Sequence, residues 1–321
     1  MLLLVYRSLI RSVIEYGPIA YDSMGDDNKR KSDSIQSQAL RIVCGVPRGT
    51  ATAALQVDVG EPPLQIRRLH QQIQYATKVK CDDQHPASAV FKFHWTDRSK
   101  RYTSNTAPIR NKVAEFFSQN SMIKWEGPIL PSRPPWHRKE VKVDVSVTKG
   151  GRKNENPTDL NIYTDASKTT EGLTAAAFFV PGFNVKYAVR LSNDISIFSA
   201  ELIAIKMSLD WVLEFSQQFN LVKNIAIFID SLSSSTAINT GKSLCRSNTL
   251  NEIYNVVDSI NVDLKLIWIP SHLGIVGYEI VDQLAQSAVT SDKIDVDIIF
   301  EINEIYTKIK EFIIAKWQTS W

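Results

Sequence analysis

The order of strand-like and helix-like segments between residues 160 and 289 most narrows the folds open to this chain. Three apolar, strand-like runs come first, and helical and strand-like patterns then alternate. This order predicts an α/β domain in which a mixed five-stranded sheet is flanked by helices. Strands are expected at 160–164, 173–180, 184–191, 224–229 and 264–268, and helices at 199–217, 232–240, 248–260 and 277–289.

Four carboxylates in this stretch stand where a buried metal site needs them. Asp165 and Asp230 each follow directly on an apolar, strand-like run. Glu201 lies at the start of a long helical pattern, and Asp282 lies within the last one, ten residues after His272. A carboxylate at the end of a buried strand is costly to desolvate unless something pairs with it. Four such positions favour a shared cation, and Mg²⁺ prefers oxygen ligands of this kind.

Each carboxylate also has a simpler interpretation. Asp165 and Asp230 could be turn residues at strand ends, and Asp282 could be a solvated helix residue. Glu201 could be favoured by the helix dipole alone, or could cap the helix. Convergence of the four side chains in space would separate these interpretations from a metal site.

Four short segments carry a more specific pattern: YTDAS (163–167), SAELIAI (199–205), FIDSLSS (228–234) and IPSHLGIVGYEIVDQLA (269–285). In this order they resemble type 1 ribonuclease H, in the form attached to reverse transcriptases of non-LTR retrotransposons. The resemblance covers roughly Pro157 to Thr290. It implies a ribonuclease H-like fold and an enzyme that cuts the RNA strand of RNA–DNA hybrids endonucleolytically. Two Mg²⁺ ions would be the cofactor, and Mn²⁺ could substitute.

The resemblance also implies roles for single residues. Asp165 would bridge both ions, and Glu201 and Asp230 would hold the ion near the leaving oxygen. Asp282 would help hold the ion that activates the water. His272 would assist proton transfer or product release.

The hybrid would be recognised by its shape and its 2′-hydroxyl groups. By resemblance, the backbone near Ala166 and Ser167 would contact the RNA strand. Ser231 and Ser233 open a helix, where phosphate oxygens are favoured, and a plain N-cap role is equally open. The candidate contacts to the DNA strand are Lys242 and Arg246.

Two positions depart from the family pattern. An Asn commonly precedes Glu279 in the family and an Ala precedes the final Asp, where this chain has Tyr278 and Val281. The bulkier Tyr278 is expected to crowd the substrate side, while the acidic ligands are retained. A second hypothesis is therefore a catalytically impaired remnant that binds nucleic acid without cutting it.

Residues 1–95 are expected to be helical, with a first helical pattern at 3–14 and further helices at 29–43 and 64–80. Their segments YRSLIRSVIEYGPIAYD, SIQSQALRIVCG and GTATAALQVDVGEPPLQIRR resemble the thumb-side end of a Jockey-type retrotransposon reverse transcriptase. No Tyr-x-Asp-Asp segment occurs, so the chain is not expected to copy nucleic acid. The expected domains are a helical remnant at 1–95, a linker at 96–157, a ribonuclease H-like domain at 158–290 and a tail at 291–321 with a helix at 302–317.

Charged residues are distributed unevenly along the chain. Residues 1–156 hold 25 basic and 15 acidic residues, a net of +10, whereas residues 157–321 hold 12 and 19, a net of −7. The basic half could bind a phosphate backbone or could be an ordinary mixed surface. The three cysteines indicate neither a disulfide framework nor a zinc knuckle. No signal peptide, membrane span or obligate protein partner is indicated, so an intracellular setting is expected.

Overall fold

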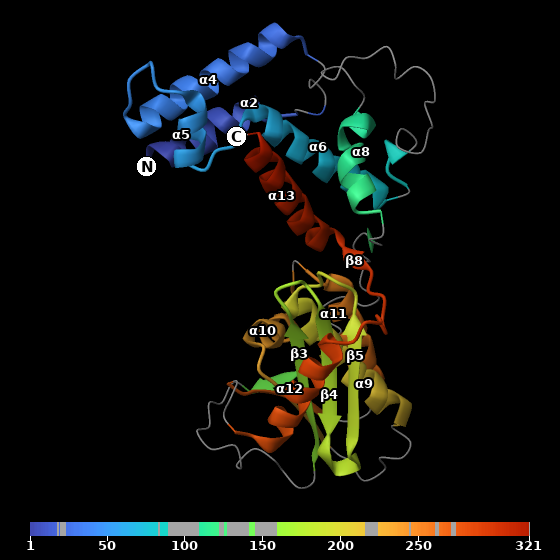
Figure 1. Cartoon of the computed structure of the whole chain (residues 1–321). Coiled ribbons are helices and arrows are strands. Elements are labelled where there is room, and N and C mark those ends of the chain that lie inside the picture. Colours follow the sequence, from blue (N-terminus) through green and yellow to red (C-terminus); the bar gives the residue numbers. More distant parts are fainter. Residues whose placement is uncertain are drawn as a thin grey trace. The chain divides into compact units, whose positions relative to one another are not determined.

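The computed structural model describes residues 1–17, 19, 24–82, 84–88, 109–121, 125–126, 141–144, 159–215, 224–243, 245–260, 263–270 and 274–320. The chain forms two compact units (Figure 1). Unit 1 comprises residues 1–127 and 305–321, and unit 2 comprises residues 128–304. His272 falls outside the described residues, as does most of the expected linker.

Unit 2 is built on a mixed sheet with the strand order β2-β7-β6-β3-β4-β5. The antiparallel pairs are β3–β4 and β4–β5, and the remaining neighbours are parallel. The five expected strands are all present, and β2, from the expected linker, adds a short sixth at the edge. The strands are β2 (Lys142–Asp144), β3 (Asp159–Lys168), β4 (Thr174–Val180), β5 (Val185–Leu191), β6 (Asn224–Ile229) and β7 (Asp263–Trp268).

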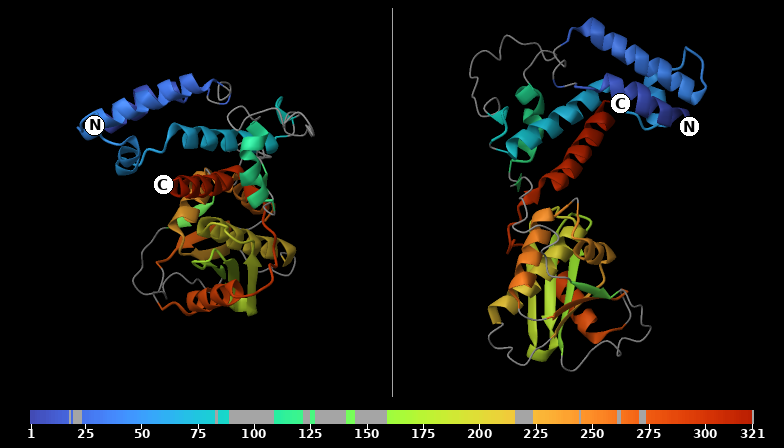
Figure 2. Two further views of the ribbon diagram at one scale, coloured as in Figure 1. Left: turned by 45° about the horizontal axis from the view of Figure 1, so that its top comes forward. Right: turned by 180° about the vertical axis from the view of Figure 1, so that it is seen from behind.

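Helices cover both faces of this sheet, because alternate strand residues point to opposite faces. On one face, Ile162 and Phe178 pack in a core with α9 and α11; on the other, Tyr163 and Phe228 pack with α12. Figure 2 shows α9 and α11 in front of the sheet when the molecule is seen from behind. The helical elements are η4 (Pro181–Phe183), α9 (Ile197–Phe215), α10 (Leu232–Thr240), α11 (Ser247–Ser259) and α12 (Val276–Val289).

Buried acidic side chains attach the segment after α12 to the rest of unit 2. Glu301, in the short strand β8 (Phe300–Glu301), accepts hydrogen bonds from the backbone N–H groups of Ser247 and Asn248 at 2.8 and 2.9 Å. Glu304 pairs with Arg246 at 2.8 Å, and both are buried. A carboxylate at the first turn of α11 satisfies free N–H groups and complements the helix dipole.

Unit 1 is mainly helical. α1, η1 and α2 form the first expected helical stretch, and α4 and α6 contain the helices expected at 29–43 and 64–80. α8 lies in the expected linker, and α5 is an element that the sequence did not predict. Among the described residues, no helix is long and apolar enough to cross a membrane. The elements are α1 (Leu2–Val5), η1 (Tyr6–Arg11), α2 (Ser12–Ile14), α4 (Asp26–Cys44), α5 (Thr52–Asp58), α6 (Leu64–Lys80), α8 (Ile109–Gln119), β1 (Trp125–Glu126) and α13 (Ile302–Thr319), which starts in unit 2.

Ion pairs and aromatic contacts hold the helices of unit 1 together. Glu61, which is 1% exposed, accepts hydrogen bonds from Arg7 and Arg11 of the first helical stretch. Phe312 of α13 packs against Phe116 of α8, with ring centroids 5.4 Å apart. The last helix of the chain therefore belongs to the core of the first unit.

Candidate active site

The register of the parallel strands β3 and β6 brings two of the predicted carboxylates together. Their last register pair is Tyr163 with Phe228. Asp165 and Asp230 each come two residues later, so they lie side by side where the β3–β6 pairing ends. β3 itself continues along β4 to Lys168, which means that Asp165 is not the end of its strand. The indole Nε1 of Trp268, at the end of β7, donates to the carbonyl of Asp230 at 2.8 Å.

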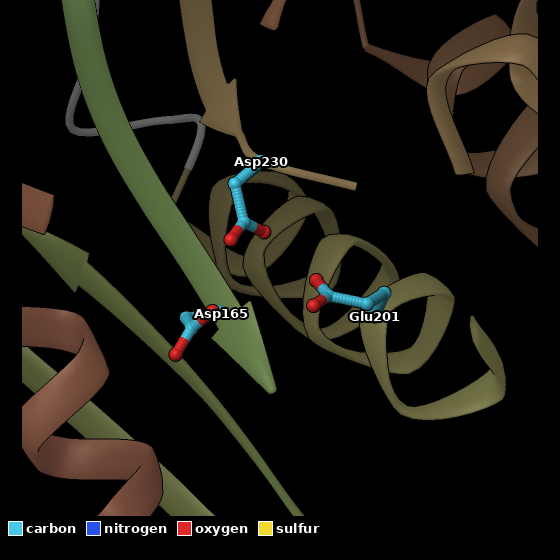
Figure 3. Close-up of side chains that lie close together, drawn as sticks. All are labelled: Asp165, Glu201 and Asp230. Carbon is cyan, nitrogen blue, oxygen red and sulfur yellow. The ribbon is translucent and has the colours of Figure 1, made fainter. Parts of the chain in front are cut away.

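Glu201 completes a cluster of three carboxylates. α9 begins at Ile197, two residues earlier than expected, so Glu201 lies in its second turn. Asp165, Glu201 and Asp230 each offer an oxygen, and these oxygens all lie within 4.8 Å of one another. Figure 3 shows the carboxylates of Asp230 and Glu201 turned toward each other and toward Asp165.

Burial makes this cluster costly without a counter-charge. Burial, and then the charge of Asp230, raises the pKa of Asp165 from 3.8 to about 7. Burial, and then the charge of Asp165, raises the pKa of Glu201 well above its ordinary value of 4.5. Oε2 of Glu201 is buried and has no hydrogen-bond partner among the described residues. A divalent cation would satisfy that oxygen and relieve the repulsion, and hard oxygen ligands suit Mg²⁺. The residues therefore fit the cofactor that the sequence predicts.

Tyr278 of α12 lies at the same site, where the sequence predicts crowding of the substrate side but not a bond to Asp165. Its side chain is 6% exposed, and its hydroxyl donates to Oδ1 of Asp165 at 2.9 Å. Burial, and then the charge of Asp165, raises the pKa of Tyr278 above its ordinary range, so the hydroxyl keeps its proton. The residue points into the protein core, packed with Tyr163 and Phe228. Its spacing of four from Asp282, which puts both on one face of a helix, was the available signal.

The fourth predicted carboxylate lies near the cluster but not within it. Asp282 is half-buried on α12, and its Oδ1 accepts a hydrogen bond from Gln286 at 2.8 Å. Its charge contributes to the raised pKa of Asp165. Among the described residues, only Asp165, Glu201 and Asp230 converge. His272 lies outside the described residues, and its predicted role stays a prediction.

The predicted substrate contacts surround the three carboxylates. The backbone N–H of Ala166 bonds to the Glu201 carboxylate and lowers its pKa, against the larger effect of burial, while Ser167 is half-buried. Ser231 is the N-cap of α10 and accepts from the N–H of Ser234. Ser233 is exposed, with its hydroxyl 3.1 Å from that of Ser231. Ser231 therefore has the plain capping role, and Ser233 is the freer of the two hydroxyl groups.

The expectation that Arg246 contacts DNA is wrong. Arg246 is 3% exposed, pairs with Glu304, and donates from Nη1 to the carbonyl of Ile299 at 2.8 Å. A guanidinium used in this way inside the protein is not available to a phosphate backbone. Lys242 lies beside a hollow of about 480 Å³ that is also lined by Ser233.

The sheet of unit 2 brings three carboxylates together where β3 and β6 stop pairing. Their oxygens are ligands of the kind that suit a divalent cation. Residues 157–290 match the family model described as RNase H. Unit 2 therefore contains the segment that matches the RNase H family. The match has the same bounds as the resemblance drawn from the sequence.

The crystal structure of RNase H1 from the halophilic archaeon Halobacterium salinarum NRC-1 is similar to part of the chain. It shares 15% sequence identity with a TM-score of 0.32, and covers 41% of this chain and 97% of that one. No curated protein matches the chain.

Proposed function

We propose that unit 2 cuts the RNA strand of RNA–DNA hybrids endonucleolytically, using divalent cations. The observation that carries this proposal is the convergence of Asp165, Glu201 and Asp230 within 4.8 Å, inside the segment that matches the RNase H family. Two Mg²⁺ ions, when bound, would supply an activated water and relief of charge on the leaving oxygen. Asp282 is the candidate fourth ligand, because its charge already acts on Asp165.

In this reaction the residues of the chain would bind the cations and position the hybrid. Asp165 is held within strand β3, Asp230 directly after strand β6 and Glu201 on helix α9, so their oxygens need little rearrangement to receive a cation. Burial excludes water from Asp165 and Glu201, which strengthens electrostatic interactions at the site. Ser233 and Lys242, beside the hollow near α10, are the candidate contacts for the hybrid.

A cleavage assay tests the proposal. The full chain should cut a labelled RNA–DNA hybrid with Mg²⁺, and EDTA should stop the reaction. Asp230→Asn should be inert, since it removes a charged ligand from the cluster. A matched RNA–RNA duplex should stay intact, because the predicted substrate is the hybrid. An intact hybrid after long incubation with folded, metal-loaded wild type would refute the proposal.

One observation favours the alternative of an impaired nucleic-acid-binding remnant. Asp282 stands outside the converging carboxylates, and the hydroxyl of Tyr278 already occupies Oδ1 of Asp165. The net charge of +10 in residues 1–156 would support binding to phosphates without cleavage. Hybrid binding that persists in EDTA, with no product in Mg²⁺ or Mn²⁺, would select this alternative.

We also propose an origin for the chain in a Jockey-like non-LTR retrotransposon, with unit 1 containing a thumb-side remnant of its reverse transcriptase. The sequence segments of residues 1–95 support this proposal, and their helical character agrees with it. Template-directed synthesis by the purified chain would contradict it, because a remnant without the polymerase aspartates cannot extend a primer.

A further inference from the structure

Tyr278 approaches the carboxylate cluster from the opposite face of the sheet to Glu201. Glu201 comes from α9, whereas Tyr278 is the third residue of α12, and the two helices pack on opposite faces. A buried hydroxyl without a partner costs free energy. Here the partner is Oδ1 of Asp165, 2.9 Å away, between two buried side chains. The bond therefore joins α12 to one of the three clustered carboxylates.

The bond is made to one of the two oxygens of Asp165. Figure 3 shows one oxygen of this carboxylate on the side of Asp230 and Glu201 and the other pointing away from them. The terminal torsion of an aspartate is broad when nothing fixes it. A donor on Oδ1 restricts that rotation, so the direction of Oδ2 is set as well.

The position of the hydroxyl is itself set by close packing. At Gly277, the preceding residue, an added Cβ would lie 2.4 Å from Cε2 of the Tyr163 ring. The first turn of α12 thus lies directly on β3, at the residue two before Asp165. Tyr163 in turn stacks on Phe228, with ring centroids 4.8 Å apart. The ring of Tyr278 therefore has a fixed base from which its hydroxyl reaches Asp165.

We propose that Tyr278 is a positioning residue of the metal site: by holding Oδ1 of Asp165, it keeps the second oxygen directed to where Glu201 and Asp230 receive a divalent cation. The inference rests on the proposed function for the presence of the cation, and concerns its binding rather than cleavage. Outer hydrogen bonds to ligating side chains change metal affinity by about 10–100-fold. We expect an effect of that size here.

Mn²⁺ binding to the full chain, without nucleic acid, tests the proposal. Free Mn²⁺ is measured by electron paramagnetic resonance for wild type and Tyr278→Phe, which keeps the ring and removes the hydroxyl. The variant should bind about 10-fold more weakly or worse. Tyr254→Phe is the matched control, because its buried hydroxyl donates to the carbonyl of Ile238 in the same unit. That control should keep wild-type affinity.

Equal or tighter Mn²⁺ binding by Tyr278→Phe would overturn the proposal, and tighter binding would show that the hydroxyl competes with the cation. A second measurement on the wild type covers the case in which the variant does not fold. With ¹³C-labelled tyrosine, the ring signal of Tyr278 should shift on titration with Mg²⁺ while that of Tyr254 stays in place. An unmoved Tyr278 signal at saturating Mg²⁺ would also overturn the proposal.

The outcome is separable from that of the cleavage assay. Weaker Mn²⁺ binding by Tyr278→Phe, together with no hybrid cleavage by wild type, would support the positioning role and refute the proposed reaction. Cleavage by wild type, together with unchanged Mn²⁺ affinity in the variant, would do the reverse. A folded wild type that binds no Mn²⁺ would refute the positioning role.

Discussion

Asp165 is buried beside two other carboxylates, and its titration connects the site to the stability of the domain. Burial, followed by the charge of Asp230, raises its pKa from 3.8 in the ordinary case to about 7. Between these two values the folded state holds a proton that the unfolded chain has released. Raising the pH through this window therefore lowers the free energy of unfolding, by up to about 1.4 kcal/mol per pH unit for one group.

We predict that metal-free wild type loses stability between about pH 4 and about pH 7. Urea unfolding in EDTA, followed across this range, measures the loss. Asp165→Asn removes the titrating group, so its free energy of unfolding should fall less steeply with pH. The remaining slope would come from Glu201, whose pKa is also raised. Equal slopes for the two proteins would contradict the prediction.

Gly277 gives a second prediction about a single residue. A methyl group there would meet the ring of Tyr163 at 2.4–2.7 Å. Gly277→Ala should therefore destabilise the protein by about 1–3 kcal/mol through overpacking. Gly182→Ala is the matched control, since nothing lies within 4 Å of its added Cβ. Urea unfolding of both variants checks the prediction, and a similar stability for the two would contradict it.

The place of some of these residues in the site could be predicted from the sequence, and that of others could not. Asp165 and Asp230 could be predicted because each follows an apolar run, and these two runs are the parts of β3 and β6 that pair in parallel. Glu201 depended on the family resemblance, because a helix residue alone does not show which side of a sheet it faces. The bond from Tyr278 could not be predicted, because it depends on the packing distance between α12 and β3.

At the scale of secondary structure, the segment that follows α12 shows how acidic residues can hold a domain together. Glu304 accepts hydrogen bonds from Ser199 at 2.6 Å and from Nε of Arg246 at 3.2 Å, besides its ion pair with that arginine. Removing one partner of a buried ion pair leaves an uncompensated charge, which costs about 3–5 kcal/mol. This segment lies beyond residue 290, where the family match ends.

Glu304→Ala should destabilise unit 2 by about 3–5 kcal/mol. Asp210→Asn is the control, because Asp210 is only partly buried and its bond with Lys206 joins neighbouring turns of α9. A pair of that kind contributes about 1 kcal/mol or less. Chemical unfolding of the two variants gives the comparison. A loss for Glu304→Ala no greater than that of the control would contradict the assigned role of the segment.

Element prediction succeeded where the periodic segments were long. The strand 224–229 and the helices 232–240 and 64–80 have the expected bounds. β2 has three residues and α5 has seven, which is too short for a reliable periodic pattern. The acidic stretch after residue 290 was read as a tail, because its partners Ser199 and Arg246 are far away in the sequence.

At the scale of the whole molecule, the two units differ in the number of chain segments that form them. Unit 2 is one continuous stretch, whereas unit 1 combines residues 1–127 with residues 305–321. α13 contributes the buried side chains Ile309 and Ile313 to unit 1, and Lys316 pairs with Glu115 at 2.5 Å. The helical unit is therefore complete only with the last helix of the chain.

We predict that ending the chain after residue 304 loosens unit 1 and spares unit 2. Hydrogen exchange should rise in α8, which loses the contacts of Glu115 and Phe116 with α13, and stay slow in β3, β4 and β6. Mn²⁺ affinity should be unchanged, because Asp165, Glu201 and Asp230 all belong to unit 2. Faster exchange in the sheet with an unaltered unit 1 would contradict this division.

The discontinuity of unit 1 also sets an order of events during synthesis. The ribosome releases the chain from its N-terminus at about 5–20 residues per second, and domains generally fold as units. Residues 1–127 are synthesised before residues 305–321, with which they form unit 1, whereas residues 128–304 need no partner that is synthesised after them. Unit 2 would thus reach its native structure before unit 1, although residues 1–127 precede it in the sequence.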